Sequence, residues 1–157
     1  MLLLGYILLN AAALFVFLKT RKVMHVLEIL VYWWISTYVY QNYSALCFMN
    51  FRTLIIPDEF TPEFAHLLNR IVLYPILMVV FLQLLLKMTG MLRKLALYIG
   101  FVLLLSALDG LDHVTGILIH SDWRAWWAFA LWMILLLFLV ASMKLLRSIL
   151  FRRDESA

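Results

Sequence analysis

The sequence predicts an all-α fold, a polytopic transmembrane helix bundle with five spans in a single domain over residues 1–157. Of the 157 residues, 66% are hydrophobic, well above the roughly 45–50% of soluble domains, so lipid is the expected solvent for most of the chain. Each of five apolar stretches approaches or exceeds the length needed to cross a hydrocarbon core, about 20 residues. They lie at about residues 2–18, 26–48, 67–86, 95–119 and 125–143.

The basic residues predict an orientation with the N-terminus outside and the C-terminus inside. Of the 13 lysines and arginines, all but Arg52, Arg70 and Arg124 follow the first, third or fifth apolar stretch. Basic residues concentrate in cytoplasmic connections, and five crossings place all of these groups on one side. A four-span arrangement would break this pattern.

The first apolar stretch is predicted to be a membrane anchor rather than a secretory signal, because its basic residues follow it instead of preceding it. The second opens with His25 and Glu28, one helical turn apart near the inner surface. Glu28 is expected to pair with Lys22 or with a base of the 87–94 connection. The alternative is that His25 and Glu28 form the inner half of a proton path.

The third stretch follows the longest connection, NFRTLIIPDEFTPEF, in which Thr61 is expected to cap the helix at Pro62. Pro75 lies within the stretch, where it removes a backbone hydrogen bond and is predicted to kink the helix near residues 71–74. The fifth stretch opens with aromatic residues that favour the outer membrane interface, namely Trp123, Trp126 and Trp127.

The fourth stretch carries ionisable residues, which are costly inside a membrane and by default face the protein interior or a wet cavity. Four ionisable residues and one glycine share one helical face at offsets 0, 3, 4, 7 and 11. The helix is expected to end or break near Gly116, with the following ILIHSDW segment along the surface. The face consists of Asp109, Asp112, His113, Gly116 and His120.

The third stretch offers a matching face near the same outer end, formed by Glu63, His66 and Arg70 at offsets 0, 3 and 7. A buried charge needs compensation, so Arg70 is predicted to pair with Asp112 or Asp109.

Under one interpretation this outer polar cluster is a structural latch. Under the other it opens outward as a proton, ion or solute site, because carboxylate and imidazole groups suit divalent cations. No HExxH or comparable metal motif is present, so no metal and no cofactor is expected.

The order of these features resembles an uncharacterised family of small multi-spanning membrane proteins from spore-forming Gram-positive bacteria. The likeness covers about residues 23–153, and in place of that family's late aspartate the second stretch has Tyr40-Gln41-Asn42-Tyr43. The resemblance implies a bacterial cytoplasmic membrane and no established activity. The matching residues are His25, Glu28, Tyr74-Pro75, Asp109, Thr115-Gly116, Trp123-Arg124 and the terminal KLLRSILFRR.

The sequence therefore predicts a multi-pass cell-membrane protein in contact with the lipid bilayer. The leading functional hypothesis is a non-enzymatic structural component that binds a second copy of itself or a larger membrane protein. The alternative is a small carrier or channel-like component that binds an ion or small solute at the outer polar cluster. The net charge of +4 is spread over short connections rather than one face, which excludes a nucleic-acid surface.

Overall fold

The computed structural model describes residues 2–20, 22–51, 54–55, 57, 60–120 and 125–151 of the chain, with residues 50–51, 54–55, 120, 125 and 150–151 described in the backbone only. Helices dominate. The elements, in chain order, are α1 (Leu2–Lys19), α2 (Val26–Leu46), the π-helical η1 (Cys47–Phe51), β1 (Leu54–Ile55), α3 (Phe60–Leu68), the π-helical η2 (Asn69–Leu73), α4 (Tyr74–Lys87), α5 (Met91–Val114), β2 (Ile119–His120) and α6 (Ala125–Phe151).

In the described part of the chain, 4 helices are long and apolar enough to cross a membrane. They correspond to the first, third, fourth and fifth predicted spans, and they indicate a membrane protein. The helix α2 has 21 residues, but its tyrosines, tryptophans and amides make it less apolar. A fifth span therefore stays a prediction. The four helices are Leu2–Lys19, Phe60–Lys87, Met91–Val114 and Trp126–Ile149.

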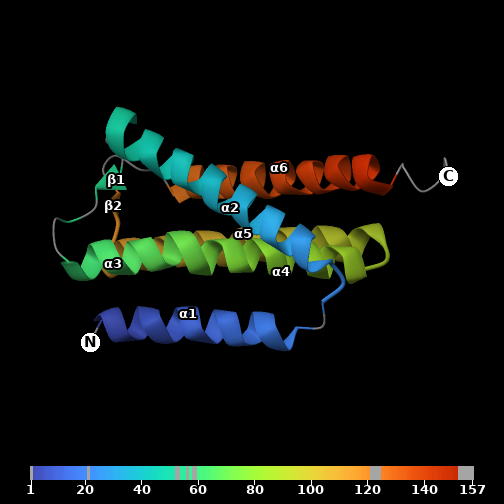
Figure 1. Cartoon of the computed structure of the whole chain (residues 1–157). Helices are drawn as coiled ribbons and strands as arrows, with labels where there is room; N and C mark the ends of the chain where they lie inside the picture. Colours follow the sequence, from blue (N-terminus) through green and yellow to red (C-terminus); the bar gives the residue numbers. More distant parts are fainter. Residues whose placement is uncertain are drawn as a thin grey trace.

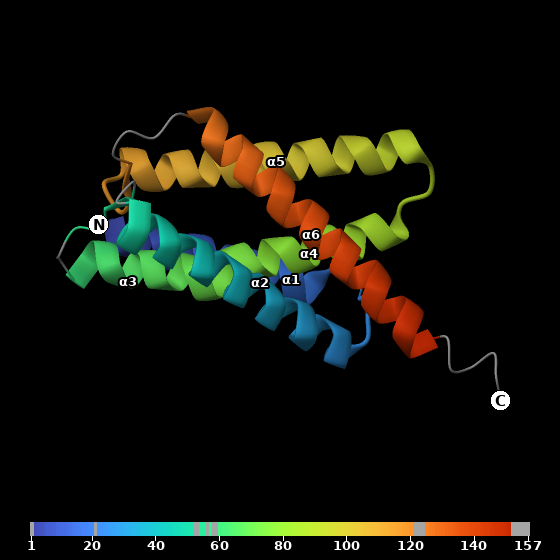
Figure 2. The ribbon, with the colours of Figure 1, turned by 90° about the horizontal axis from the view of Figure 1, so that it is seen from above.

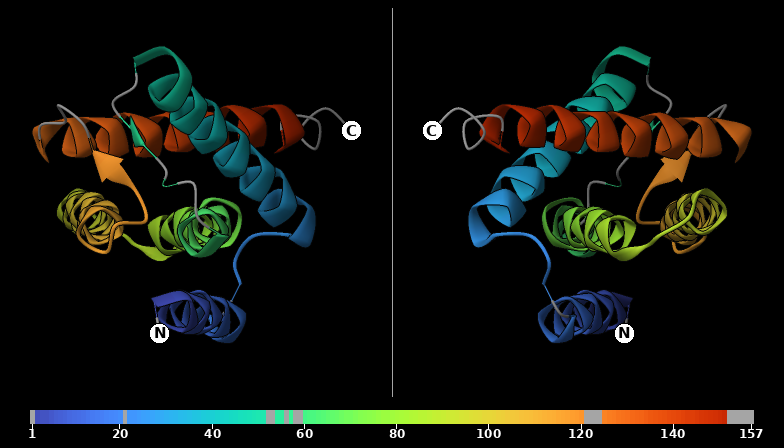
Figure 3. Two further views of the ribbon diagram at one scale, coloured as in Figure 1. Left: turned by 90° about the vertical axis from the view of Figure 1, so that its left-hand side faces the viewer. Right: turned by 90° about the vertical axis from the view of Figure 1, so that its right-hand side faces the viewer.

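The helices form layers (Figures 1 and 3). The continuous rod of α3, η2 and α4 lies beside α5 in a middle layer, with α1 on one side and α2 and α6 on the other. Seen from above, α6 crosses obliquely over α4 and α5 (Figure 2). The N-terminal end of α1, β1 and β2 gather at one end of the bundle. The α1–α2 and α4–α5 connections and the end of α6 gather at the other.

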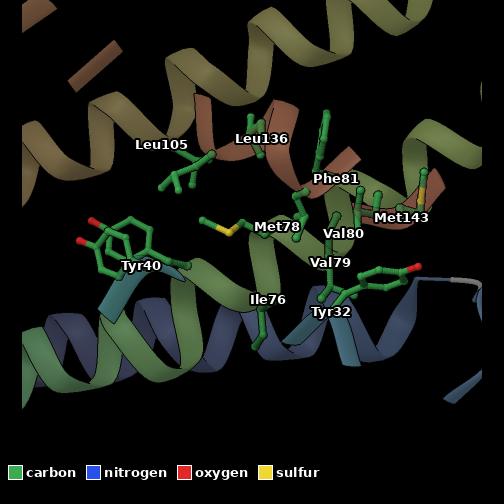
Figure 4. Close-up of a cluster of buried hydrophobic side chains, with 14 of the residues drawn as sticks. Tyr32, Tyr40, Ile76, Met78, Val79, Val80, Phe81, Leu105, Leu136 and Met143 are labelled. Carbon is green, nitrogen blue, oxygen red and sulfur yellow. The ribbon is translucent and has the colours of Figure 1, made fainter. Parts of the chain in front are cut away.

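The core is centred on α4, whose side chains are buried against several neighbours. Ile76, Val79 and Phe81 of α4 are fully enclosed, and side chains of α2, α5 and α6 converge on them (Figure 4). Leucines on the outer faces of α1 and α5, in contrast, are exposed. An apolar exterior around a tightly packed centre is what a lipid solvent permits.

The predicted boundaries of three helices differ from the structure. The third helix begins at Phe60 rather than residue 67, so Thr61 lies inside its first turn instead of capping it, where Pro62 is tolerated because first-turn N–H groups have no helical partner. The fourth helix begins at Met91 and ends at Val114 instead of residue 119. The fifth extends to Phe151 rather than residue 143.

The segment after α5 folds inward instead of lying along the surface. Gly116 adopts a positive φ of 74°, a conformation that glycine reaches without strain. Ile117 and Leu118 are then buried, and Ile119–His120 pairs antiparallel with Leu54–Ile55. The predicted helix end near Gly116 thus becomes a reversal that covers the end of α5.

A π-helical segment occupies the place where the sequence predicted a kink. In η2 the N–H of Tyr74 donates to the carbonyl of Asn69, five residues back. Pro75 follows directly and has no N–H to donate. Such π segments are rare and insert one extra residue into the helical turn. The residues before η2 therefore face different neighbours than a continuous α-helix would give them.

Candidate functional site

Asp112 of α5 is the centre of a buried hydrogen-bond network that includes residues of α1, η2 and α4. Its carboxylate accepts from Asn69 Nδ2 at 3.0 and 3.2 Å and from the Tyr74 hydroxyl at 2.8 Å. Asn10 Nδ2 of α1 donates to Asn69 Oδ1 at 3.0 Å. Asp112 is only 1% exposed. The carboxylate therefore links α5, η2 and α1 inside the protein.

The π segment explains why Asn69 and Tyr74 can both reach Asp112. Residues five apart on an α-helix point about 140° away from each other. The wider turn of η2 brings the two side chains to one side of the rod. The next residue, Arg70, lines a cavity together with Phe48 of η1, and no hydrogen bond or ion pair joins Arg70 to Asp109 or Asp112 among the described residues. The predicted Arg70–aspartate pair is thus corrected to an Asn69–Asp112–Tyr74 set.

The network is closed at the C-terminal end of α5 by the reversal that follows this helix. The amides of Ile117 and Leu118 donate to the Asp112 carbonyl oxygen at 2.9 and 3.0 Å. The hydroxyls of Tyr6 and Thr115, 2.9 Å apart, form a further hydrogen bond between α1 and the end of α5. This closure separates Asp112 from the end of the bundle that holds β1 and β2 and favours a structural role for its carboxylate.

The other predicted residues of the α5 face have different environments. Asp109 is buried one turn before Asp112. His113 is exposed, with Nδ1 3.3 Å from the Leu118 carbonyl oxygen. His120 pairs through its backbone with Leu54, and its side chain lies outside the described part. The expected stripe is therefore not one continuous surface.

The second half of the predicted cluster forms an open cavity of about 610 Å³. Glu63, His66 and Arg70 lie along one side of α3 and η2 and line it. Phe48 of η1 faces them, so the cavity lies between the outer end of α2 and α3. The remaining lining residues are Phe60, Phe64 and Leu67. We call this cavity the outer pocket.

Two polar residues of the outer pocket, His66 and Arg70, have buried atoms without hydrogen-bond partners among the described residues. His66 is 2% exposed, and neither of its ring nitrogens has a hydrogen-bond partner in the part of the chain that the structure describes. The same holds for Nε of Arg70. More than nine in ten buried polar groups in proteins are hydrogen-bonded. These atoms are enclosed and lack a hydrogen-bond partner, and a ligand in the adjoining outer pocket can supply one once their side chains turn toward it.

The predicted outer polar cluster is thus divided into a closed network around Asp112 and the outer pocket around Glu63, His66 and Arg70. Sequence reasoning missed the uncharged members of the network. Asn10 is an amide within an otherwise apolar first span, which is itself a signal, because polar side chains in spans usually bond across helices. Asn69 and Tyr74 were not predicted, because the charge of the neighbouring Arg70 made it the expected partner of Asp112.

The inner pair, His25 and Glu28, forms a helix cap. His25 Nδ1 accepts from the N–H of Leu27, and the N–H of His25 donates to Glu28 Oε2 at 3.1 Å. Glu28 also accepts from Arg147 of α6, from Nε at 2.9 Å and from Nη2 at 3.1 Å. The partner predicted from local sequence, Lys22 or a base of the 87–94 connection, is therefore replaced by Arg147.

Arg147→Ala is expected to lower the free energy of unfolding by about 1–2 kcal/mol, because it leaves the largely buried Glu28 carboxylate without its bidentate partner. The cost is moderated because the Arg147 side chain is 28% exposed. Denaturation in mixed detergent micelles measures the change. Lys144→Ala removes an exposed base of the same helix and should change the value by less than about 0.5 kcal/mol; equal effects of the two variants would contradict the pairing.

No group of three or more His, Cys, Asp or Glu residues in the described ranges could hold a metal ion. No family model matches the chain. No curated protein and no solved structure matches it either. The candidate site therefore rests on the chain's own residues, and the family resemblance stays a prediction.

Proposed function

We propose that this chain is a five-span protein of the bacterial cytoplasmic membrane, with its N-terminus outside and its C-terminus inside, that binds a small charged ligand in the outer pocket. The ion or solute binding envisaged for the whole outer cluster is thereby assigned to its open half. A structural role is assigned to the closed half around Asp112.

The distribution of charge supports the orientation. Lys22, Lys87, Arg93 and Lys94 lie at or next to the connections of one end of the bundle, and Arg147 lies near the end of α6 at that same end. Basic residues favour the cytoplasmic side, so this end is proposed to be inside. The outer pocket, at the start of α3, then faces the outside.

The placement of α2 supports a fifth crossing. The helix runs from the basic end to the end that carries β1 (Figure 1), and at about 1.5 Å per residue its length approaches the thickness of a hydrocarbon core. Its polar residues are accommodated partly inside, since Glu28, Ser36 and Ser44 are buried.

The observation that supports ligand binding is the set of unpartnered buried atoms of His66 and Arg70 in a cavity that also exposes Glu63. Leaving such atoms unbonded costs about 1–3 kcal/mol each. A ligand that bonds them recovers this cost. Binding requires no reaction, in keeping with a non-enzymatic role.

A structural, partner-binding component is the second candidate. The Asp112 network supports it, because it fastens α1, η2 and α5 together without reaching the outer pocket. A partner of this kind would be a second copy of the chain or a larger membrane protein, recognised through exposed apolar faces.

Inorganic phosphate is expected to raise the melting temperature of the delipidated protein in neutral detergent by about 3 °C relative to chloride at equal ionic strength, by binding the native state at Arg70 and His66. Arg70→Gln should abolish this difference. Arg93→Gln removes an exposed arginine at the opposite end and should retain it. Equal melting temperatures of the wild type in the two salts would contradict ligand binding in the outer pocket.

A further inference from the structure

We propose that the ligand of the outer pocket is the phosphoethanolamine headgroup of a phospholipid from the outer leaflet, with its phosphate at Arg70 and His66 and its ammonium at Glu63. This inference rests on the proposed function and names the chemistry of the same site.

The charges of the outer pocket favour a zwitterion. Glu63 and Arg70 both line it, and seven residues of helix place them about 10 Å apart along the axis. A purely anionic ligand would meet the Glu63 carboxylate, and a purely cationic one would meet the Arg70 guanidinium, each with unfavourable electrostatics. A ligand with one charge of each sign is complementary to both residues.

The order of the charges matches a phospholipid that enters from outside. Glu63 lies near the start of α3, at the end of the bundle that holds β1 and β2, and Arg70 lies nearly two turns further in (Figure 1). In a phospholipid the phosphate is attached nearer the acyl chains than the ammonium is. The deeper Arg70 therefore meets the phosphate when the ammonium reaches Glu63.

A second, largely apolar cavity lies further along the rod from the outer pocket. Leu67 lines the outer pocket, and Ile71, about one turn further along the rod, lines a second cavity of about 330 Å³ between η2 and α2. Its other lining residues are Leu30, Trp33, Trp34 and Thr37. A free zwitterion makes no use of this surface. An acyl chain attached to the bound headgroup fills it.

The aromatic rim also fits a lipid at the membrane interface. The rings of Phe60 and Phe64 stack at 5.7 Å between centroids, and Phe60 is 74% exposed. Because the faces of these two rings pack against each other, they are not free to contact the ammonium. The Glu63 carboxylate is therefore the main group that can bind it. A carboxylate only accepts hydrogen bonds, and a primary ammonium donates three. This favours ethanolamine over choline, whose nitrogen donates none.

Lipid retention tests the headgroup. The full chain is exposed to an equimolar mixture of phosphatidylethanolamine, phosphatidylcholine and phosphatidylglycerol, and native mass spectrometry counts the bound lipids. Phosphatidylethanolamine is expected to exceed each of the others about fivefold, the factor that one charge-assisted hydrogen bond supports. Glu63→Gln should remove this preference, because phosphatidylethanolamine loses the partner of its ammonium and the anionic phosphatidylglycerol, no longer repelled by a carboxylate, binds more tightly. Arg70→Gln should reduce binding of all three, and Arg93→Gln should match the wild type.

Equal retention of the three lipids by the wild type, or a preference that survives Glu63→Gln, overturns the inference. A soluble headgroup distinguishes a lipid from a free solute. Ile71→Trp fills the apolar cavity and should lower phosphatidylethanolamine retention about tenfold without changing the binding of glycerophosphoethanolamine. If glycerophosphoethanolamine binds as tightly as the lipid and Ile71→Trp changes neither, the ligand is a free zwitterion. In that case the inference fails while the proposed function, tested by phosphate, stands.

Discussion

Asp112→Ala is expected to lower the free energy of unfolding by about 3 kcal/mol, because two buried donors lose their acceptor at once. Asn69 Nδ2 and the Tyr74 hydroxyl both donate to this carboxylate, which is only 1% exposed. Hydrogen bonds between membrane helices average less than this, about 0.6 kcal/mol each. The expected loss of about 3 kcal/mol is larger because Asp112→Ala leaves two buried donors without an acceptor. Denaturation monitored by tryptophan fluorescence measures it.

Two further variants separate the network from simple loss of volume. Asp112→Asn keeps one carbonyl acceptor and nearly the same shape, so it should lose roughly half as much stability as Asp112→Ala. His113→Ala changes an exposed neighbour of the same helix and should change the value by less than about 0.5 kcal/mol. An Asp112→Ala protein as stable as the wild type would show that the carboxylate does not hold the helices together.

Trp132→Ala is expected to cost about 3–4 kcal/mol, because the indole is completely buried and its removal leaves a large cavity. Trp132 of α6 packs on Tyr40 of α2, with ring centroids 5.4 Å apart, and on Tyr74 of α4, at 5.1 Å. These three rings join three helices beneath the Asp112 network. Since lipid is as apolar as a side chain, close packing of this kind is a main source of helix association in membranes.

The matched comparison for this variant is Trp126→Ala. Trp126 begins the same helix but is 60% exposed, so its removal should change the free energy of unfolding by less than about 1 kcal/mol. Trp132→Phe keeps an aromatic ring against Tyr40 and should recover a large part of the loss. Similar losses for Trp126→Ala and Trp132→Ala would contradict the packing described for α6.

Much of the helical layout could be predicted from the sequence, because long apolar stretches and the positions of lysine and arginine depend on local composition. Four of the predicted spans correspond to helices that can cross a membrane. The second was harder to judge, because α2 combines Glu28, Gln41 and Asn42 with aromatic residues. Its burial against α4 and α6 depends on residues far away in the chain.

The site could be predicted only in part, because a constant helical period was assumed. Glu63, His66 and Arg70 do share one side and line one cavity, since they lie before or at the start of η2. The π turn of η2 changes how the rod faces its neighbours, and Asn69, the first residue of η2, rather than Arg70 meets Asp112. The only residue in the sequence that indicates an irregular turn here is Pro75, which has no N–H to bond to the preceding turn.

The ion pair across the bundle could not be predicted from the sequence either. Glu28 pairs with Arg147, which lies 119 residues further along the chain, whereas the nearby Lys22 lies over the ring of Phe17 at 5.1 Å. The choice among several bases at one end of a bundle depends on how helices cross. That crossing is set by packing, such as the contact of Tyr40 with Trp132.

Cysteine accessibility distinguishes an open outer pocket from the closed face of α5 that lies beside it. In a Cys47→Ser background, a membrane-impermeant thiol reagent is applied to either side of sealed vesicles containing Arg70→Cys, Ser106→Cys or Arg93→Cys. We expect Arg70→Cys to react only from the outer side, Arg93→Cys only from the inner side, and Ser106→Cys, buried two turns from Asp112 on α5, from neither. Reaction of Ser106→Cys as fast as Arg70→Cys, or reaction of Arg70→Cys and Arg93→Cys from the same side, would contradict the account.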